Sequence, residues 1–441
     1  MHGVKVSRWS LSYFAVAVVS LLLAELLLAL GIADPLGALT GGWTLTAVHL
    51  TTLGWATWLM LGALQQFVPV LIQQELASQT AAGVTLAAGT LGLAALLAGF
   101  LSLPGGIGWP LTWALPWGGT LVVLAALVAL INLGITLFRA RPWTASMSFI
   151  ATGLGFFLLT ILLGLTFALA LASPGEAWAP VLEHGLAGHL WGGLVGWLTL
   201  TAMGVAYKLL AMFTLAPEER GWWPWVAYTL TAAGVTALWL SPWLPGWPLA
   251  LGGWVAGTLG IATFLVDLIR LYAQRKRRSL ELNARMARFA LAALGLAVLS
   301  AVALRLRLLP PTLWPAVIFY WLYGWIGGLG LSQLYKIVPF LTWIERYGKK
   351  LGRTAVPRVQ DLVRESRDEP AFWAYAAAAL AASLALAAQA GLAFRLAAAL
   401  LFLATLDIAR GLLRVRIPVR ASKTPPPPAE PKTLPRRRTQ P

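Results

Sequence analysis

The chain has 441 residues, of which 59% are hydrophobic and 11% are charged. Soluble proteins carry roughly 25% charged residues, so this composition excludes an ordinary soluble domain and predicts a polytopic membrane protein. The net charge of +17 falls in short segments between apolar runs, as the positive-inside rule predicts, and therefore does not indicate a nucleic-acid partner. The absence of cysteine excludes disulfides, thiolate metal sites and cysteine nucleophiles.

The apolar runs predict an all-α fold, with twelve transmembrane helices if each span takes roughly 20 residues. In chain order the predicted ranges are 9–31, 43–73, 80–103, 110–138, 145–172, 187–214, 222–241, 247–273, 286–307, 312–343, 370–391 and 393–415. The first run lacks a small-residue cleavage site, so we interpret it as a retained helix after an N-terminal segment, 1–8. The membrane domain is 9–415, and the proline-rich, basic residues 416–441 are predicted to form a disordered tail.

The links between the predicted helices alternate in charge. Links that follow the fourth, eighth and tenth helices carry Arg and Lys, whereas those that follow odd-numbered helices are rich in Gly and Pro, with few basic residues. The N-terminal segment carries Lys5 and Arg8, and the tail ends in three arginines, 436–438. This pattern predicts that both termini face the cytoplasm and that the protein lies in the plasma (inner) membrane, with the lipid bilayer as its partner.

A motif recurs on predicted helices two, six and ten. A Gly-Trp pair is followed after eight residues by a small residue and after eleven by a polar pair. The three copies are Gly54-Trp55, Gly62 and Gln65-Gln66; Gly196-Trp197, Gly204 and Tyr207-Lys208; and Gly324-Trp325, Ser332 and Tyr335-Lys336. The spacing predicts three four-helix repeats, at about 9–141, 145–278 and 286–415. Because four is even, the repeats share one orientation, around an axis along the membrane normal. The small residues predict a strip where another backbone approaches closely.

Three histidines are candidates for a cofactor site. His49 and His189 begin the membrane parts of helices two and six, in the outer half of the bilayer. Neutral imidazole is a common ligand of haem iron and copper, so each is either such a ligand or a residue of the apolar interior. We interpret His184 as an exposed interfacial residue, with a ligand role as the alternative.

Five charged residues could define an intramembrane polar path: Glu25, Lys208, Asp267, Lys336 and Asp407. A charge at the depth of Glu25 is costly, so Glu25 is predicted to be protonated or paired, with Arg395 as the candidate partner. Each aspartate has an arginine three residues later and can pair with it along the helix. The lysines are near helix ends and can extend to the headgroups instead.

Twelve helices in three arcs, internal termini and a histidine near the outer end of helix two resemble the haem-copper oxidase subunit I superfamily, which includes terminal cytochrome oxidases and nitric-oxide reductases. The segments GWLTLTAMGVAYKLL and YKIVPFLTWIERYG also resemble bacterial proteins described as oxidase subunit I-like. The resemblance implies that His49 is the helix-two ligand of a low-spin haem. It also implies that His189, or alternatively His184, is the helix-six ligand of copper.

The chain departs from this superfamily at two helices. The family's histidine pair on helix seven and its histidines on helix ten are absent, because 222–241 and 312–343 contain none. We therefore expect at most one haem, no complete copper site, no conventional oxygen reduction and no catalytic residue.

The expected function is a respiratory-chain-associated protein that acts in electron transfer, oxidase assembly or haem and copper handling, with other respiratory-complex subunits as partners. A secondary transporter or channel-like protein and a ligand-free structural subunit are the alternatives.

Overall fold

The computed structural model describes residues 7–37, 39–218, 221–244 and 248–417, which form helices and no strands. The predicted tail from 418 onward and residues 1–6 of the N-terminal segment lie outside the described residues. The main helices are α1 (Ser10–Ala29), α2 (Gly42–His49), α3 (Trp58–Ile72), α4 (Gln79–Phe100), α5 (Ala114–Phe138), α6 (Ala145–Ala172), α7 (Ala179–Trp191), α8 (Leu200–Thr214), α9 (Trp223–Leu240), α10 (Leu249–Ala273), α11 (Leu282–Arg305), α12 (Trp314–Tyr320), α13 (Gly328–Tyr347), α14 (Glu365–Ala387) and α15 (Gly391–Val415). Short 3₁₀ turns are η2 (Glu176–Trp178), η4 (Pro311–Leu313), η6 (Gly348–Lys350) and η7 (Val359–Leu362).

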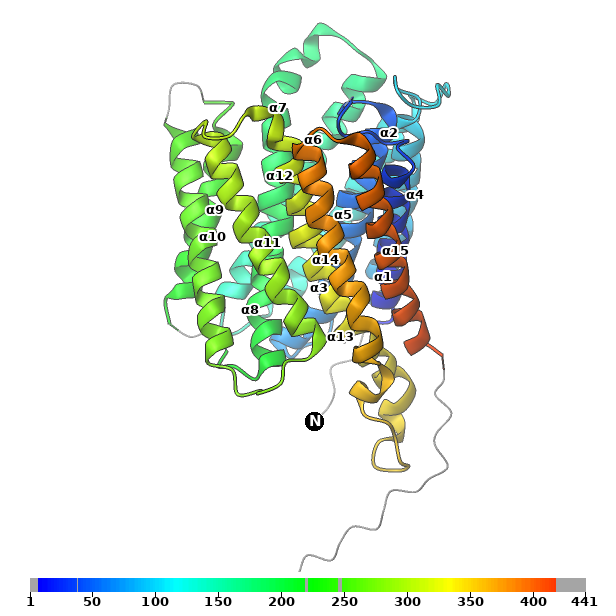
Figure 1. Ribbon diagram of the computed structural model, residues 1–441, viewed down its shortest axis with the longest axis vertical. Helices are drawn as coiled ribbons and strands as arrows, with labels where there is room; N and C mark the ends of the chain where they lie inside the picture. The colour runs from blue at the N-terminus through cyan, green and yellow to red at the C-terminus, as the bar shows by residue number, and fades with distance from the viewer. Residues whose placement is uncertain (1–6, 38, 219–220, 245–247, 418–441) are drawn as a thin grey trace, which may run out of the picture.

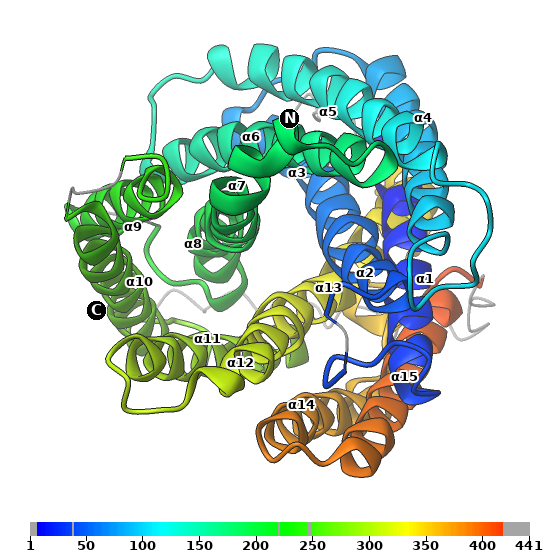
Figure 2. The same cartoon turned by 90° about the horizontal axis from the view of Figure 1, so that it is seen from above.

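The helices run up and down in one bundle (Figure 1). Seen from above, α1, α4, α5, α6, α9, α10, α11, α14 and α15 surround three inner helices, each built from two α-helical parts: α2–α3, α7–α8 and α12–α13 (Figure 2). The last helix, α15, packs against the first, α1, so the outer helices close on themselves at this seam.

Ten helical segments among the described residues are long and apolar enough to cross a membrane. This confirms an all-helical protein of the membrane-embedded type. The other two predicted spans form α9 and the helix from α12 to α13, which are helical but rich in Trp, Tyr, Gly and Thr and therefore less apolar.

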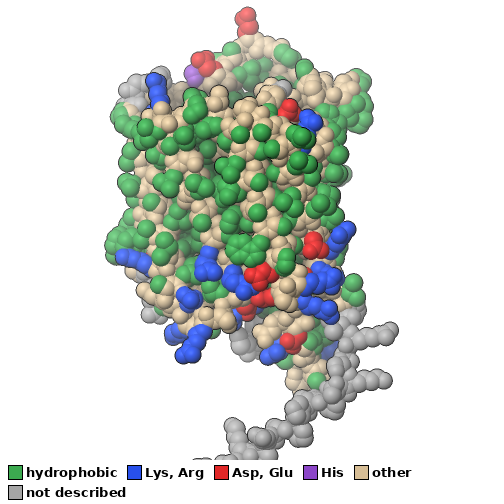
Figure 3. Space-filling view, viewed as in Figure 1, with side chains coloured by type: hydrophobic (Ala, Val, Ile, Leu, Met, Phe, Trp, Pro, Cys, Tyr) green, Lys and Arg blue, Asp and Glu red, His purple; other side chains and the backbone are tan. Residues whose placement is uncertain are grey.

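Charge and hydrophobicity separate along the bundle axis. Lys and Arg gather mainly at the lower end in Figure 3, over the links between α10 and α11 and between α13 and α14. We call this the basic end. Above it the visible surface is mostly apolar (Figure 3). Exposed apolar side chains include Leu91 on α4, Ile131 on α5 and Leu299 on α11. Such a large exposed apolar surface is stable only in contact with lipid.

Each inner helix widens into a π-helical segment at its Gly-Trp pair. These segments are η1 (Leu50–Thr57), η3 (Gly192–Thr199) and η5 (Trp321–Gly327), and each joins its two α-helical parts without a break. A π-turn hydrogen-bonds from i to i+5 and is rare, often marking a functional site. The sequence motif therefore coincides with a shared backbone irregularity that periodicity did not predict.

The glycines of the motif lie against the helices that begin the predicted repeats. A Cβ on Gly54 would come 2.7 Å from the Cβ of Ser20 on α1, and one on Gly324 would come 3.1 Å from that of Ala293 on α11. Gly196 meets the ring of Phe156 on α6 in the same way. A larger side chain at any of these glycines would therefore push against the neighbouring helix.

Candidate functional site

The three π-helical segments contact one another near the centre of the bundle. The indole N–H of Trp197 donates to Thr57 Oγ1 at 3.0 Å, and that of Trp321 donates to Thr199 Oγ1 at 2.9 Å. A hydrogen bond of 2.8 Å between Thr51 Oγ1 and the Tyr323 hydroxyl links the remaining pair, η1 and η5. All six side chains therefore come from positions within three residues of a motif glycine. The bonds hold the inner helices in fixed register.

His49 is the last residue of α2, where the helix begins to widen. Its Nδ1 lies 2.8 Å from the carbonyl oxygen of Leu45, one turn earlier. Its ring packs on Phe100 of α4, with 4.6 Å between ring centroids. The imidazole thus faces α4, the next outer helix in the chain.

His189 lies near the end of α7, in the turn before η3. Its Nδ1 is 2.9 Å from the carbonyl oxygen of Thr160 on α6, and its ring meets the edge of Phe167. His184 is different: its half-exposed side chain lies 4.0 Å from Glu183 and beside Trp243.

The backbone contacts fix the tautomer of both inner histidines. A carbonyl oxygen can only accept, so each Nδ1 carries the proton and donates it. The lone pair of each ring is then on Nε2, which has no hydrogen-bond partner among the described residues. A histidine held by its Nδ1–H on a backbone carbonyl has the orientation typical of metal-ligating imidazoles.

Glu25 is fully buried on α1, with an exposed fraction of 0%. Its Oε1 accepts a hydrogen bond of 2.9 Å from Thr405 Oγ1 on α15, whereas its Oε2 has no partner among the described groups. The expected partner, Arg395, instead lies against Gly31. The predicted partner, Arg395, is therefore wrong, because α15 places Thr405 at the depth of Glu25.

Both lysines of the motif form ion pairs at the basic end. Lys208 Nζ is 2.6 Å from Glu218, and Lys336 Nζ is 2.5 Å from Glu281. Glu281 also pairs with Arg277. Burial acts to raise the pKa of the Glu281 carboxyl, but the hydrogen bonds and charges of Lys336 and Arg277 outweigh it and lower the pKa below its ordinary value. These contacts favour the interpretation in which the lysines reach out of the apolar surface.

Neither aspartate forms a direct ion pair with the arginine three residues later, although the charge of Arg270 still acts on Asp267. The Arg270 guanidinium stacks 3.9 Å above the ring of Trp223 on α9, while Asp267 interacts with the Tyr207 hydroxyl. Asp407 and Arg410 are exposed on α15, and neither forms an ion pair with a described residue. An exposed Asp407 does not line an interior path.

Sequence reasoning missed a polar group at the basic end. Asn283, 1% exposed at the start of α11, has no partner for either amide atom among the described groups. It lines a small pocket with Glu281, Tyr335 and Lys336. A single asparagine near a charged link carries no distinctive spacing, so the sequence gives no signal for it.

Comparison with known proteins adds no assignment. The sequence matches no protein-family model, and a search of curated proteins finds no match.

Proposed function

We propose that the protein is an integral membrane protein of the haem-copper oxidase subunit I type, with a reduced cofactor site formed by His49 and His189. The proposed architecture has twelve spans in three four-helix repeats, with both termini and the basic end facing the cytoplasm of the plasma membrane. The shared π-helical segments and the Trp–Thr bonds between them support this arrangement. The inner helices then occupy equivalent places around one axis.

The cofactor proposal rests on the tautomer that the two imidazoles share. Each donates Nδ1–H to a backbone carbonyl and presents Nε2. His49 and His189 would hold a haem iron through Nε2, and the bound haem would supply one-electron chemistry. The superfamily's oxygen-reducing centre requires further histidines, which the sequence lacks. The proposed role is therefore electron transfer, or haem handling in oxidase assembly, beside other respiratory-complex subunits.

A reduced-minus-oxidised spectrum of the full chain, purified from cells that make haem, tests this proposal. We expect a haem band that is lost in both His49→Ala and His189→Ala and kept in His184→Ala, the matched control. A colourless, metal-free preparation that also fails to take up added haemin would overturn it. Loss of the band in the His184 variant alone would move the ligand to that residue.

A transport function is the second candidate, favoured by the buried, half-partnered carboxyl of Glu25. Intramembrane ionisable groups commonly mark proton or ion pathways. Proteoliposomes with a pH-sensitive dye inside should then show a proton flux that Glu25→Gln abolishes. Asp407→Asn is the control, because Asp407 is exposed on the outside of the bundle. Equal fluxes in liposomes with and without protein would exclude this candidate.

A further inference from the structure

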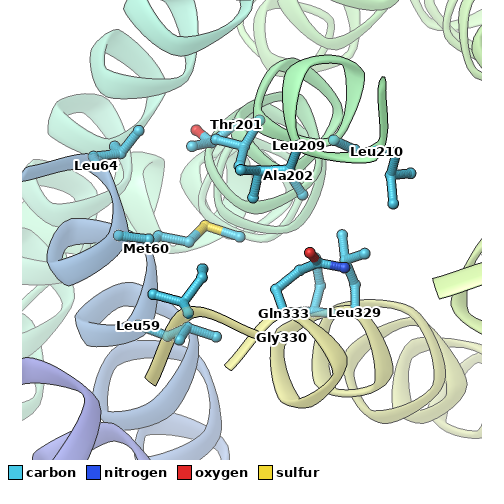
Figure 4. A pocket seen from close by; sticks show the side chains of 15 residues that line it. Leu59, Met60, Leu64, Thr201, Ala202, Leu209, Leu210, Leu329, Gly330 and Gln333 are labelled. Carbon is cyan, nitrogen blue, oxygen red and sulfur yellow. The ribbon is translucent and has the colours of Figure 1, made fainter. Parts of the chain in front are cut away.

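The three inner helices enclose an apolar cavity on the side of their π-helical segments nearer the basic end. It is lined by fifteen residues of α3, α8, η5 and α13 and has a volume of about 70 Å³ (Figure 4). This volume is several times what one water molecule needs, so the cavity has room for a small ligand.

The cavity wall follows the sequence motif. Positions five, six and nine after the motif glycine line it in all three copies, which places one face of each helix on the cavity. These residues are Leu59, Met60 and Ala63 of α3, Thr201, Ala202 and Val205 of α8, and Leu329, Gly330 and Gln333 of α13. Several of them, including Met60 and Val205, are partly exposed, so the cavity is not sealed.

Gln333 is a polar residue in this mainly apolar wall. The equivalent residues are Ala63 and Val205, so packing at this position does not require an amide. The Gln333 side chain reaches from α13 toward the space between α3 and α8 (Figure 4). It is 8% exposed, and its Oε1 has no partner among the described groups. An unpaired acceptor in apolar surroundings is costly, so a donor in the cavity would stabilise it.

The neighbouring Ser332 fixes which end of the amide is free. Ser332 Oγ donates its one proton to the carbonyl oxygen of Leu329 at 2.7 Å, so it can only accept from Gln333. Gln333 Nε2 is 3.3 Å from that oxygen and is the donor. The free atom is therefore the acceptor Oε1. The hydroxyl of Thr201, the other polar group of the wall, lies against Gly153 of α6.

We propose that this cavity binds an uncharged, membrane-soluble alcohol, whose hydroxyl donates to Gln333 Oε1 and whose apolar body contacts the three helices. A charged ligand is disfavoured, because the nearest motif cations, Lys208 and Lys336, are already paired with Glu218 and Glu281. The proposal is independent of the haem site, since it uses the opposite side of the π-helical segments.

Photolabelling of the full chain in nanodiscs tests the site. The probe is an octanol that carries a diazirine, and the control probe is the matching diazirine-bearing octane, which lacks the hydroxyl. We expect the alcohol to label peptides of α3, α8 and α13, and octanol to compete. In Gln333→Leu the alcohol labelling should fall about fivefold to tenfold, the value of one hydrogen bond, while the octane labelling is unchanged.

Two further variants control for folding and space. Gln274→Leu, at the exposed end of α10, should leave both probes unaffected. Val205→Phe, or Ala63→Leu if that variant does not fold, should exclude both probes by filling the cavity. Equal labelling by the two probes, labelling confined to the outer surface, or an unchanged signal in Gln333→Leu would each overturn the proposal.

Discussion

Trp197 donates its indole N–H to the hydroxyl of Thr57, a residue 140 positions earlier in the chain, over 3.0 Å. Thr57 passes its own proton to the carbonyl oxygen of Thr52, five residues back, at 2.9 Å. The pair Trp321 and Thr199 repeats this arrangement, with Leu194 as the carbonyl. In each pair, one threonine hydroxyl donates to a backbone carbonyl of its own π-helical turn and accepts from the tryptophan of a neighbouring inner helix.

Replacing Thr57 with valine should therefore destabilise the bundle by about 1–3 kcal/mol, because it leaves a buried indole N–H without an acceptor. Thr52→Val is the matched control, since the Thr52 hydroxyl is exposed and bonds to its own helix. We expect a change within about 0.5 kcal/mol there. Equilibrium unfolding in mixed micelles measures both. Equal stabilities of the two variants would contradict the assigned role of Thr57.

Gly204→Ala should destabilise the protein, because the added Cβ would come 2.6 Å from the Cβ of Phe149 and 2.9 Å from the backbone oxygen of Ser146. A backbone neighbour cannot move aside cheaply. The loss is expected to be about 1–3 kcal/mol. Gly155→Ala on α6 meets nothing within 4 Å and should be neutral or stabilise the helix by up to about 1 kcal/mol. A comparison of melting temperatures in one detergent distinguishes the two.

Thr405→Val removes the partner of the Glu25 carboxyl and should cost about 1–3 kcal/mol, since both carboxyl oxygens are then buried without a donor. Adding Glu25→Leu should restore most of the loss, because a well-packed apolar pair replaces a half-satisfied polar one. The double-mutant cycle is read from unfolding free energies. If the two losses simply add, the residues are not energetically coupled.

The ion pair of Glu281 predicts an acid-sensitive contribution to stability. Because the folded-state pKa is lowered, the contribution is complete above the unfolded value of about 4.3 and disappears as the pH falls through the folded value. Wild type should be more stable than Glu281→Gln at pH 7, and the difference should close in acid below the ordinary glutamate range. A gap that persists unchanged at low pH would show that Glu281 acts through packing rather than charge.

The proposed orientation can be tested directly, because the chain contains no cysteine. A single cysteine introduced as Lys350→Cys, at the basic end, should react with a membrane-impermeant maleimide only after the cells are permeabilised. Gly108→Cys, in the link between α4 and α5 at the other end, should react in intact cells. The reverse pattern would invert the proposed topology.

The apolar runs and the motif predict much of the fold. The predicted range 43–73 corresponds to the helix from Gly42 to Ile72, and the motif glycines do mark close helix contacts. The π-helical widening was not predicted, because a change of one residue per turn depends on how each helix meets its neighbours. Periodicity alone does not contain that information.

The polar contacts were predicted less well than the helices. Arg270 was expected to pair with Asp267, but Trp223 on the adjacent α9 offers its ring face to the guanidinium. Similarly, Thr405 rather than Arg395 reaches Glu25, because rotation and depth of α15 decide which residue faces α1. The state of the histidine pair also depends on a contact absent from local sequence, the carbonyl of Thr160 on α6.

The contact between α1 and α15 makes the seam of the bundle equivalent to a junction between consecutive helices. Both helices reach the basic end there, α1 beginning and α15 ending at it (Figure 1). A circularly permuted chain, in which a linker joins Arg416 to Ser7 and new ends open between α5 and α6, would keep the packing of α1 against α15. The order of connection could thus change while the bundle stays the same.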